Sequence, residues 1–359
     1  MAIETHDAFR EILKTISQDG GFDSVDGLLT NIGREQGLGN QNAIFSDLFL
    51  GFNRRTQGNQ APANRDRQGL SFFTRPDLNL AYDNVALVNK LTPLLSTHSN
   101  TYQRAIRVML YPDGHRGGSN ILAPGIFDER QAFMSLLSNT LTSMSGWPGM
   151  VLNAYNTPEG MAKETWIMND SIAEINGRFD ISCTFRNVMG DPVTGTFFPW
   201  LVYEGAVYTN RMVPLKSNLV AGRIDYTTRI YRFVLDHQNR FIQKWACCGA
   251  AFPYSLDIGA AFNYDREEVY NPSLNDINVS FVCVGAVYND PRIFRWFNTT
   301  AAAFNPMLLE GRDNKRLIKI PYDEEMRMNY RGYPWVNERT GELEWWATPE
   351  QIQYVATGY

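Results

Sequence analysis

The chain has 359 residues, a length that fits one large domain or two ordinary ones. Apolar residues make up 44% of it, enough for a hydrophobic core, and the formal net charge of −5 argues against a free-standing nucleic-acid binder. No apolar run reaches the roughly 18–20 residues of a membrane-spanning helix, and the acidic N-terminus does not read as a secretory signal.

The first part of the chain is expected to form a helix followed by a polar arm. Residues 1–17 carry apolar side chains at helical spacing, at Phe9, Ile12, Leu13 and Ile16. From residue 20 to residue 69 the chain is rich in Gly, Asn, Gln, Asp and Arg, with only short apolar islands. Such a segment either becomes ordered when a partner covers the islands or stays a disordered linker.

Residues 70–149 open the part of the chain that is expected to fold. An alternating pattern over residues 101–111 places Tyr102, Ile106 and Leu110 on one face and predicts an extended segment. Residues 128–141 are expected to form a helix that begins near Asp128. A glycine and proline break follows at residues 145–149.

The middle of the chain predicts long strands. Strict alternation over residues 178–186 indicates a strand with one buried face and one face toward water or a partner. Residues 197–208 are expected to be a short aromatic helix. A hairpin is expected from residues 223–235 and 240–248, joined by a turn, and a further strand over residues 276–288.

The C-terminal region begins with a helix that Asp290 caps and Pro291 opens. Beyond Pro306, charges, aromatic residues and turn residues mix with little periodicity, which is typical of a tail that lies on a neighbour or on its own domain. We therefore expect ordering by neighbouring subunits for residues 18–69 and 306–359. The expected division is 1–69 for the helix and arm, 70–305 for the folded domain and 306–359 for the C-terminal extension.

Few residues suggest chemistry. The four cysteines, at positions 183, 247, 248 and 283, form no disulfide framework or CxxC pair, and the four histidines lie apart from them, so no metal site is expected. The glycine-rich segment Gly114–Ser119 lacks the helix that follows a phosphate loop. Asp236 and His237 are adjacent on the chain, so their side chains point apart on a strand. We expect no catalytic residue, cofactor or metal.

Two weaker signals concern partners and acidic residues. The chain contains 26 arginines and only 7 lysines, and arginine with aromatic residues is enriched at protein interfaces, although genomic base composition produces the same bias. Asp265, Glu267 and Glu268 form an acidic cluster. Paired carboxylates in glycosidases come from separate elements around a cleft, so an exposed acidic loop is the simpler interpretation.

The order of several segments carries a resemblance. These are Phe72–Leu80, Leu136–Gly149, Gly177–Tyr203, Ile224–Asp265 and Ile277–Asn298. In the last two, Phe252, Pro253 and Ser255 precede the pair Tyr264–Asp265 and then a strand of the form IxVSFxxxxxxY. The sequence resembles the tail-tube-like proteins of contractile-tailed bacteriophages, either the tube or the baseplate proteins on which the tube is initiated.

The resemblance implies an α+β fold, mainly β: an antiparallel β-sandwich or barrel with a flanking helix. It implies a non-enzymatic virion protein that forms a six-fold ring and stacked rings. Its partners would be further copies of itself and tube, sheath or baseplate proteins. DNA would pass through without specific binding, and this chain would insert in no membrane. Assembly would take place in the host cytoplasm. The small acidic net charge is consistent with a lumen that repels phosphate.

Other functions stay open at this point. Within the same class, the chain fits a neck or tail-completion ring. From other classes, aromatic-rich loops fit a carbohydrate- or receptor-binding tail module, and Glu267 with Glu268 would be the acidic pair of a peptidoglycan hydrolase.

Overall fold

The computed structural model describes residues 66–96, 98, 101–113, 126–172, 175–264, 266, 275–310, 312, 316–322 and 332–357. The chain divides into two compact units, Met1–Asp66 and Arg67–Tyr359. The predicted N-terminal helix and nearly all of the polar arm lie outside the described residues.

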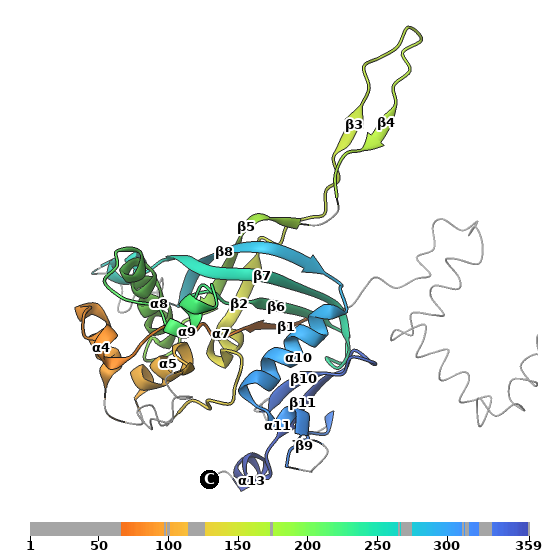
Figure 1. Ribbon diagram of the computed structural model, residues 1–359. Coiled ribbons are helices and arrows are strands. Elements are labelled where there is room, and N and C mark those ends of the chain that lie inside the picture. Colours follow the sequence, from red (N-terminus) through yellow and green to blue (C-terminus); the bar gives the residue numbers. More distant parts are fainter. Residues whose placement is uncertain are drawn as a thin grey trace, which may run out of the picture. The chain divides into compact units, whose positions relative to one another are not determined.

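The second unit is built on a six-stranded antiparallel sheet with the order β1-β6-β7-β8-β5-β2 (Figure 1). Its strands are β1 (Arg67–Phe73), β2 (Leu141–Ser145), β5 (Ile175–Arg186), β6 (Ile230–Leu235), β7 (Ile242–Leu256) and β8 (Asp276–Tyr288). The central strands β7 and β8 are the longest, at 15 and 13 residues. The expected mainly β fold with flanking helices is therefore confirmed.

Helices cover one face of this sheet. They are α4 (Tyr82–Val85), the 3-10 helix η1 (Asn89–Leu95), α5 (Tyr102–Leu110), α7 (Ser135–Thr140), α8 (Pro192–Tyr208) and α9 (Lys216–Val220). Ile181 of β5 and Phe281 of β8 are fully buried on this face and are directly paired, and Phe197 and Trp200 of α8 pack in the same core. This core stabilises the fold through large aromatic side chains, each of which buries roughly 150–250 Å².

Among the described residues, the cover of the opposite face lies over β1, β6 and the first half of β7. The cover consists of α10 (Arg292–Phe304), α11 (Met307–Glu310), β9 (Ile318–Lys319), β10 (Tyr333–Val336), β11 (Leu343–Ala347) and α13 (Pro349–Thr357). Phe297 of α10 meets Phe72, Tyr231 and Phe233 of the sheet at ring-centroid distances of 5.0, 5.4 and 5.1 Å. Figure 1 shows α10, β10 and β11 below this end of the sheet.

Two glycines break the side-chain alternation, so that β7 and β8 contribute side chains to the hydrophobic cores on both faces of the sheet. Gly249 of β7 and Gly285 of β8 lie opposite each other, between the pairs Cys248–Ala286 and Ala250–Val284. Cys248 and Ala251 both face the helix-covered core although they are three residues apart, so the alternation of side chains is broken here. Gly285 has φ of +72°, which only glycine adopts readily, and a Cβ on Gly249 would lie 3.1 Å from the carbonyl oxygen of Val284.

A narrow hairpin interrupts the connection between β2 and β5. It contains β3 (Ala154–Asn156) and β4 (Ile167–Asn169), and Figure 1 shows it extending away from the six-stranded sheet. Every residue of both strands is exposed. At its base, the ring of Trp147 packs on Phe179 and Tyr288, and the Tyr288 hydroxyl donates a 2.6 Å hydrogen bond to the Pro148 carbonyl.

Several sequence-based predictions are confirmed. The strand expected at 178–186 is the second part of β5, and the strand expected at 276–288 is β8. The expected hairpin exists as β6 and β7, although residues 223–229 precede β6 and contain a turn at 225–226 and an isolated bridge from Thr228 to Ala251. The helix expected after Asp290 is α10, but it begins at Arg292 and its N-cap is Pro291, one residue later than predicted. Asp290 still accepts a 2.9 Å hydrogen bond from the Arg292 amide.

Three predictions about helices and strands are wrong. Residues 101–111 form α5, because the buried run Ile106 to Leu110 lies between η1 and α8 and satisfies its backbone within a helix. The helix expected at 128–141 is reduced to α7, because Phe133 bridges to Thr74 and residues 141–145 join the sheet as β2. Helix α8 begins at Pro192, so Pro199 lies in its interior and not in its first turn.

The expectation for residues 306–359 is also corrected. Their described part packs on its own chain, with Tyr333, Val336 and Leu343 buried in the same core as Phe72 and Phe297. The charged composition of this segment hid that outcome, because two strands of only four and five residues supply most of the buried apolar side chains.

Candidate assembly surface

None of the described elements covers the side of β2, β5 and β8 that lies opposite the helices, and this face is mostly polar. It follows from alternation: the side chains next to buried Ile181, Cys183 and Phe185 point to the other side. We call it the open face. Its members are Ser143 and Ser145 of β2, Arg178, Asp180, Ser182, Thr184 and Arg186 of β5, and Asp276, Asn278, Ser280, Val282 and Val284 of β8.

Small hydroxyl and amide side chains dominate the open face, and its charges balance. The Thr184 hydroxyl donates a 2.9 Å hydrogen bond across the strands to the Asn278 side-chain oxygen. Arg178 lies 3.5 Å from Asp180, with both side chains largely exposed. Arg186 and Asp276 are paired in register. Such a face offers short polar side chains and little net charge.

The sheet ends in β1 on one side and β2 on the other. The end of β1 continues into a bridge between Thr74 and Phe133, so that edge is partly paired. Strand β2 pairs only with β5 among the described strands, so its outer side offers unpaired backbone groups. An unpaired edge of this kind accepts a strand from another chain.

The cysteines considered for chemistry are structural, and the glycine-rich segment and the acidic cluster lie outside the described residues. All four cysteines are free and buried, and burial raises the pKa of the Cys183 and Cys247 thiols, so neither is an activated nucleophile. In the part of the chain that the structure describes, no group of three or more His, Cys, Asp or Glu residues is arranged to hold a metal ion. Gly114–Ser119, Asp265, Glu267 and Glu268 lie outside the described residues.

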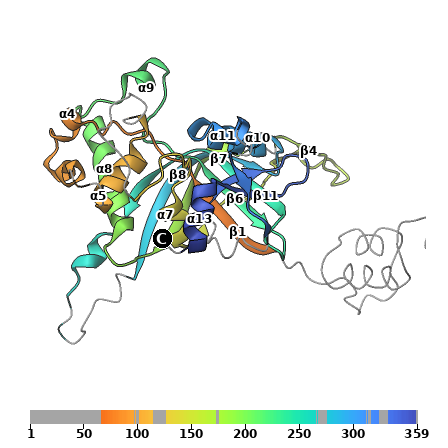
Figure 2. The same ribbon diagram turned by 90° about the horizontal axis from the view of Figure 1, so that it is seen from below.

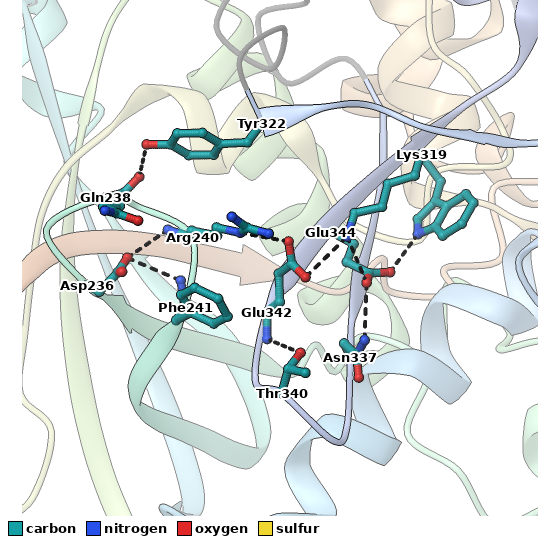
Figure 3. A network of polar contacts seen from close by, with 11 residues as sticks. Asp236, Gln238, Arg240, Phe241, Lys319, Tyr322, Asn337, Thr340, Glu342 and Glu344 are labelled. Carbon is teal, nitrogen blue, oxygen red and sulfur yellow. Dashed lines mark hydrogen bonds and ion pairs between the residues drawn. The ribbon is translucent and has the colours of Figure 1, made fainter. Parts of the chain in front are cut away.

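A network of charged and polar side chains ties the β6–β7 turn to the C-terminal strands (Figure 3). Glu342 accepts from Arg240 at 2.9 Å and pairs with Lys319 at 3.2 Å. Burial opposes ionisation, but these two cations hold the pKa of Glu342 below its ordinary value. The Asp236 carboxylate accepts from the Arg240 and Phe241 amides, which makes Asp236 a turn residue with no catalytic partner.

The sequence did not reveal two features of this surface. Only residue 141 of β2 was expected to be helical, residue 145 was placed in a glycine and proline break, and no strand was predicted between them, so the edge that β2 forms was missed. The exposed hairpin of β3 and β4 was also missed, because three-residue strands leave too short a pattern, although the apolar residues around Met150 and Trp166 in a polar setting are a signal in hindsight.

Comparisons with known proteins identify the class. Residues 15–357 match the model of the family described as "Putative phage tail tube protein". The chain belongs to this family of phage tail tube proteins, and the match extends beyond residues 70–298, where the resemblance in the sequence was seen. Its class is therefore a structural component of a phage tail. No curated protein matches the sequence.

Three solved structures show a low similarity to the chain. The cap of the anti-feeding prophage, which terminates its tube, shares 11% identity over 42% of this chain and 79% of that chain, with a TM-score of 0.26. The sheath–tube complex of the extracellular contractile injection system PVC shares 11% over 44% and 82%, with a TM-score of 0.27. Its sheath/tube terminator shares 10% over 42% and 85%, with a TM-score of 0.25.

In the described ranges, no helix is both long and apolar enough to cross a lipid bilayer.

Proposed function

We propose that the chain is a ring-forming subunit of the inner tube of a contractile phage tail, or of the baseplate-proximal ring that continues it. Six copies would close a ring in which the sheets join edge to edge. Rings would stack into a conduit within the virion. The observation that carries the proposal is the uncovered polar face of β2, β5 and β8, next to the unpaired edge of β2.

Edge-to-edge closure follows from the physics of sheets. A free strand edge such as that of β2 invites unspecific pairing, and closing a ring with identical neighbours removes this hazard. The neighbouring copy would supply a strand to β2 and would receive one at its own opposite edge, near β1. We propose that the joined open faces then form the lumen wall.

The chemistry of the open face suits a wall along which DNA slides. Phosphate groups bind to clustered, unpaired cations, whereas Arg178 on this face is paired with Asp180 and Arg186 lies opposite Asp276. Serine and threonine offer short hydroxyls without strong charge. The net charge of the whole chain is a weaker argument, because the described open face carries equal numbers of acidic and basic residues.

Labelled tubes test which face lines the lumen. The single variant Ser280→Cys places a thiol on the open face, and the native cysteines are buried. A gold-maleimide cluster attached before assembly should appear inside the tube in cross-section. Thr92→Cys on η1, exposed on the helix-covered side, is the matched control and should label the outside.

Two outcomes would overturn the proposal. One is a purified chain that stays monomeric in electron micrographs under conditions that assemble other tail components. The other is gold from Ser280→Cys on the outer surface. We also propose that the protein has no enzymatic activity, so a zymogram on bacterial cell walls should show no clearing band, and a clearing band would favour the hydrolase alternative.

A further inference from the structure

The β3–β4 hairpin has one apolar face. Tyr155 and Met168 are directly paired across the two strands, and Trp166 follows on the same side because side chains alternate. These three side chains are 50%, 56% and 72% exposed. The other side carries Asn156, Asn169 and one large apolar residue, Ile167. A two-stranded hairpin alone is marginally stable in water, so an apolar side of this size requires cover.

A second set of exposed apolar residues lies on adjoining segments around α4 and α9. Its members are Tyr82, Leu87, Val213, Leu219, Val220 and Ile224, all more than half exposed. We call it the α9 patch. Val213 joins the two segments, because its amide donates to the Asn84 side chain at 3.1 Å and its carbonyl accepts from the same side chain at 3.1 Å. Figure 2 shows α4 and α9 at the same end of the unit.

The two surfaces have opposite charge. In the hairpin, Glu159, Glu164 and Asp170 against Lys163 leave two net negative charges. Around the α9 patch, four basic side chains are exposed, those of Lys90, Arg211, Lys216 and Arg223, against one exposed acidic side chain, Asp83. Half-buried Asp77 accepts a 3.0 Å hydrogen bond from Asn218 of α9 and lowers the excess of basic residues to two. Complementary charges around apolar centres favour one partner orientation and speed association.

From these surfaces we infer that the β3–β4 hairpin of one copy docks on the α9 patch of a second copy of the chain. The contact is heterologous, since two different surfaces meet, and a pair of copies keeps one free hairpin and one free patch. A contact of this kind propagates from copy to copy. The inference rests on the proposed self-assembly and adds to it the residues that hold neighbouring copies together.

Paired cysteines test the contact directly. The double variant Met168→Cys and Leu219→Cys places one thiol on each surface, while the native cysteines are buried. Under mild oxidation during assembly it should form a ladder of disulfide-linked multimers on a non-reducing gel. Moving the first thiol to the opposite side of the hairpin, as Ile167→Cys with Leu219→Cys, is the matched control and should give markedly less ladder.

The single variants decide between contact types. If Met168→Cys alone yields covalent dimers as its main product, then hairpins pair with each other and the inference is wrong. If the double variant yields no ladder while electron micrographs show rings or tubes, the inference also fails, but the proposed function stands. A chain that never assembles overturns both.

Charge reversal gives an independent readout. Glu164→Lys should reduce assembly at low salt by about tenfold or more, since the introduced lysine would meet a basic surface. Combining it with Lys216→Glu and Arg223→Glu should restore assembly. Failure of the combined variant to recover, with its thermal melting unchanged from that of the single variant, would contradict the assigned pairing.

Discussion

Individual arginines explain part of the unusual arginine content. The guanidinium of Arg75 donates to four backbone carbonyls, those of Val108, Met109, Glu129 and Gln131, at 2.6–3.2 Å. It also lies about 5 Å from the ring centroids of Phe127 and Phe304. Arg107, also buried, donates to the Leu80 carbonyl. Interfaces with other chains are therefore not the only use of arginine in this protein, because Arg75 and Arg107 join segments inside one chain.

Lysine cannot replace Arg75. Its ammonium has three donors and no planar fork, so Arg75→Lys should leave carbonyls unsatisfied and lower the free energy of unfolding by about 2–3 kcal/mol. Urea unfolding measures the loss. The exposed Arg178→Lys is the control and should behave as the wild type, and an equal effect of both variants would contradict the assigned role of Arg75.

One buried carboxyl group makes stability depend on pH. Burial, together with the nearby Asp225, raises the pKa of Glu204 to about 9, and the buried Glu204 Oε1 has no hydrogen-bond partner in the structure. The folded state thus holds a proton that the unfolded state releases above its ordinary pKa. The contribution of Glu204 to the free energy of unfolding is therefore most favourable at acidic pH, and it is lost as the pH rises toward 9.

Glu204→Gln should remove this dependence. The variant should melt at a higher temperature than the wild type at pH 8 and at a similar temperature at pH 5. Burial also raises the pKa of Asp225, so part of the pH dependence should remain. Thermal melts across pH 5–9 provide the measurement. Glu310→Gln on exposed α11 is the control, and a pH profile for Glu204→Gln that matches the wild type would refute the argument.

At the level of elements, the end of β2 depends on a glycine. Gly146 has φ of +106°, and a Cβ at this position would lie 2.2 Å from the Asp180 carbonyl oxygen. Because that atom belongs to the backbone of β5, no rotamer change relieves the clash. Gly146→Ala should therefore separate β2 from β5 and cost about 2 kcal/mol or more.

The neighbouring glycine provides a matched control for this substitution. A Cβ on Gly149 would meet nothing within 4 Å, so Gly149→Ala should leave the melting temperature nearly unchanged. Differential scanning calorimetry compares the two variants. If tubes form with Gly146→Ala as readily as with the wild type, the edge of β2 is not part of the ring closure that we propose.

For the whole molecule, the C-terminal strands complete the fold. The core around Phe297, on this face of the sheet, also contains the buried side chains of Tyr333, Val336, Leu343 and Ala347. Arg240 and Lys319 add charged contacts to Glu342 across this junction (Figure 3). The segment after residue 305 therefore belongs to the same cooperative unit as the sheet.

Deletion of residues 306–359 should leave this core exposed. The shortened chain should bind a hydrophobic dye and aggregate, because several large apolar side chains lose about 1.5–3 kcal/mol of burial each. Dye fluorescence and sedimentation of the purified chain measure both effects. A soluble, monomeric product with the melting temperature of the full chain would show that the extension is separable, as the division 1–69, 70–305 and 306–359 predicts.

The strands β5 and β8 and the helix α10 were determined by the sequence alone, because regular alternation or helical spacing over nine or more residues specifies both the element and its buried face. Their order also carried the resemblance to tail tube proteins. Short and ambiguous segments were decided only by tertiary packing. Residues 102–110 became a helix because their buried run lies between two helices, and residues 141–145 became a strand because β5 offered an edge. The open face, the hairpin and the α9 patch likewise depend on which surfaces other elements leave uncovered, and this is a property of the assembled fold that no local pattern encodes.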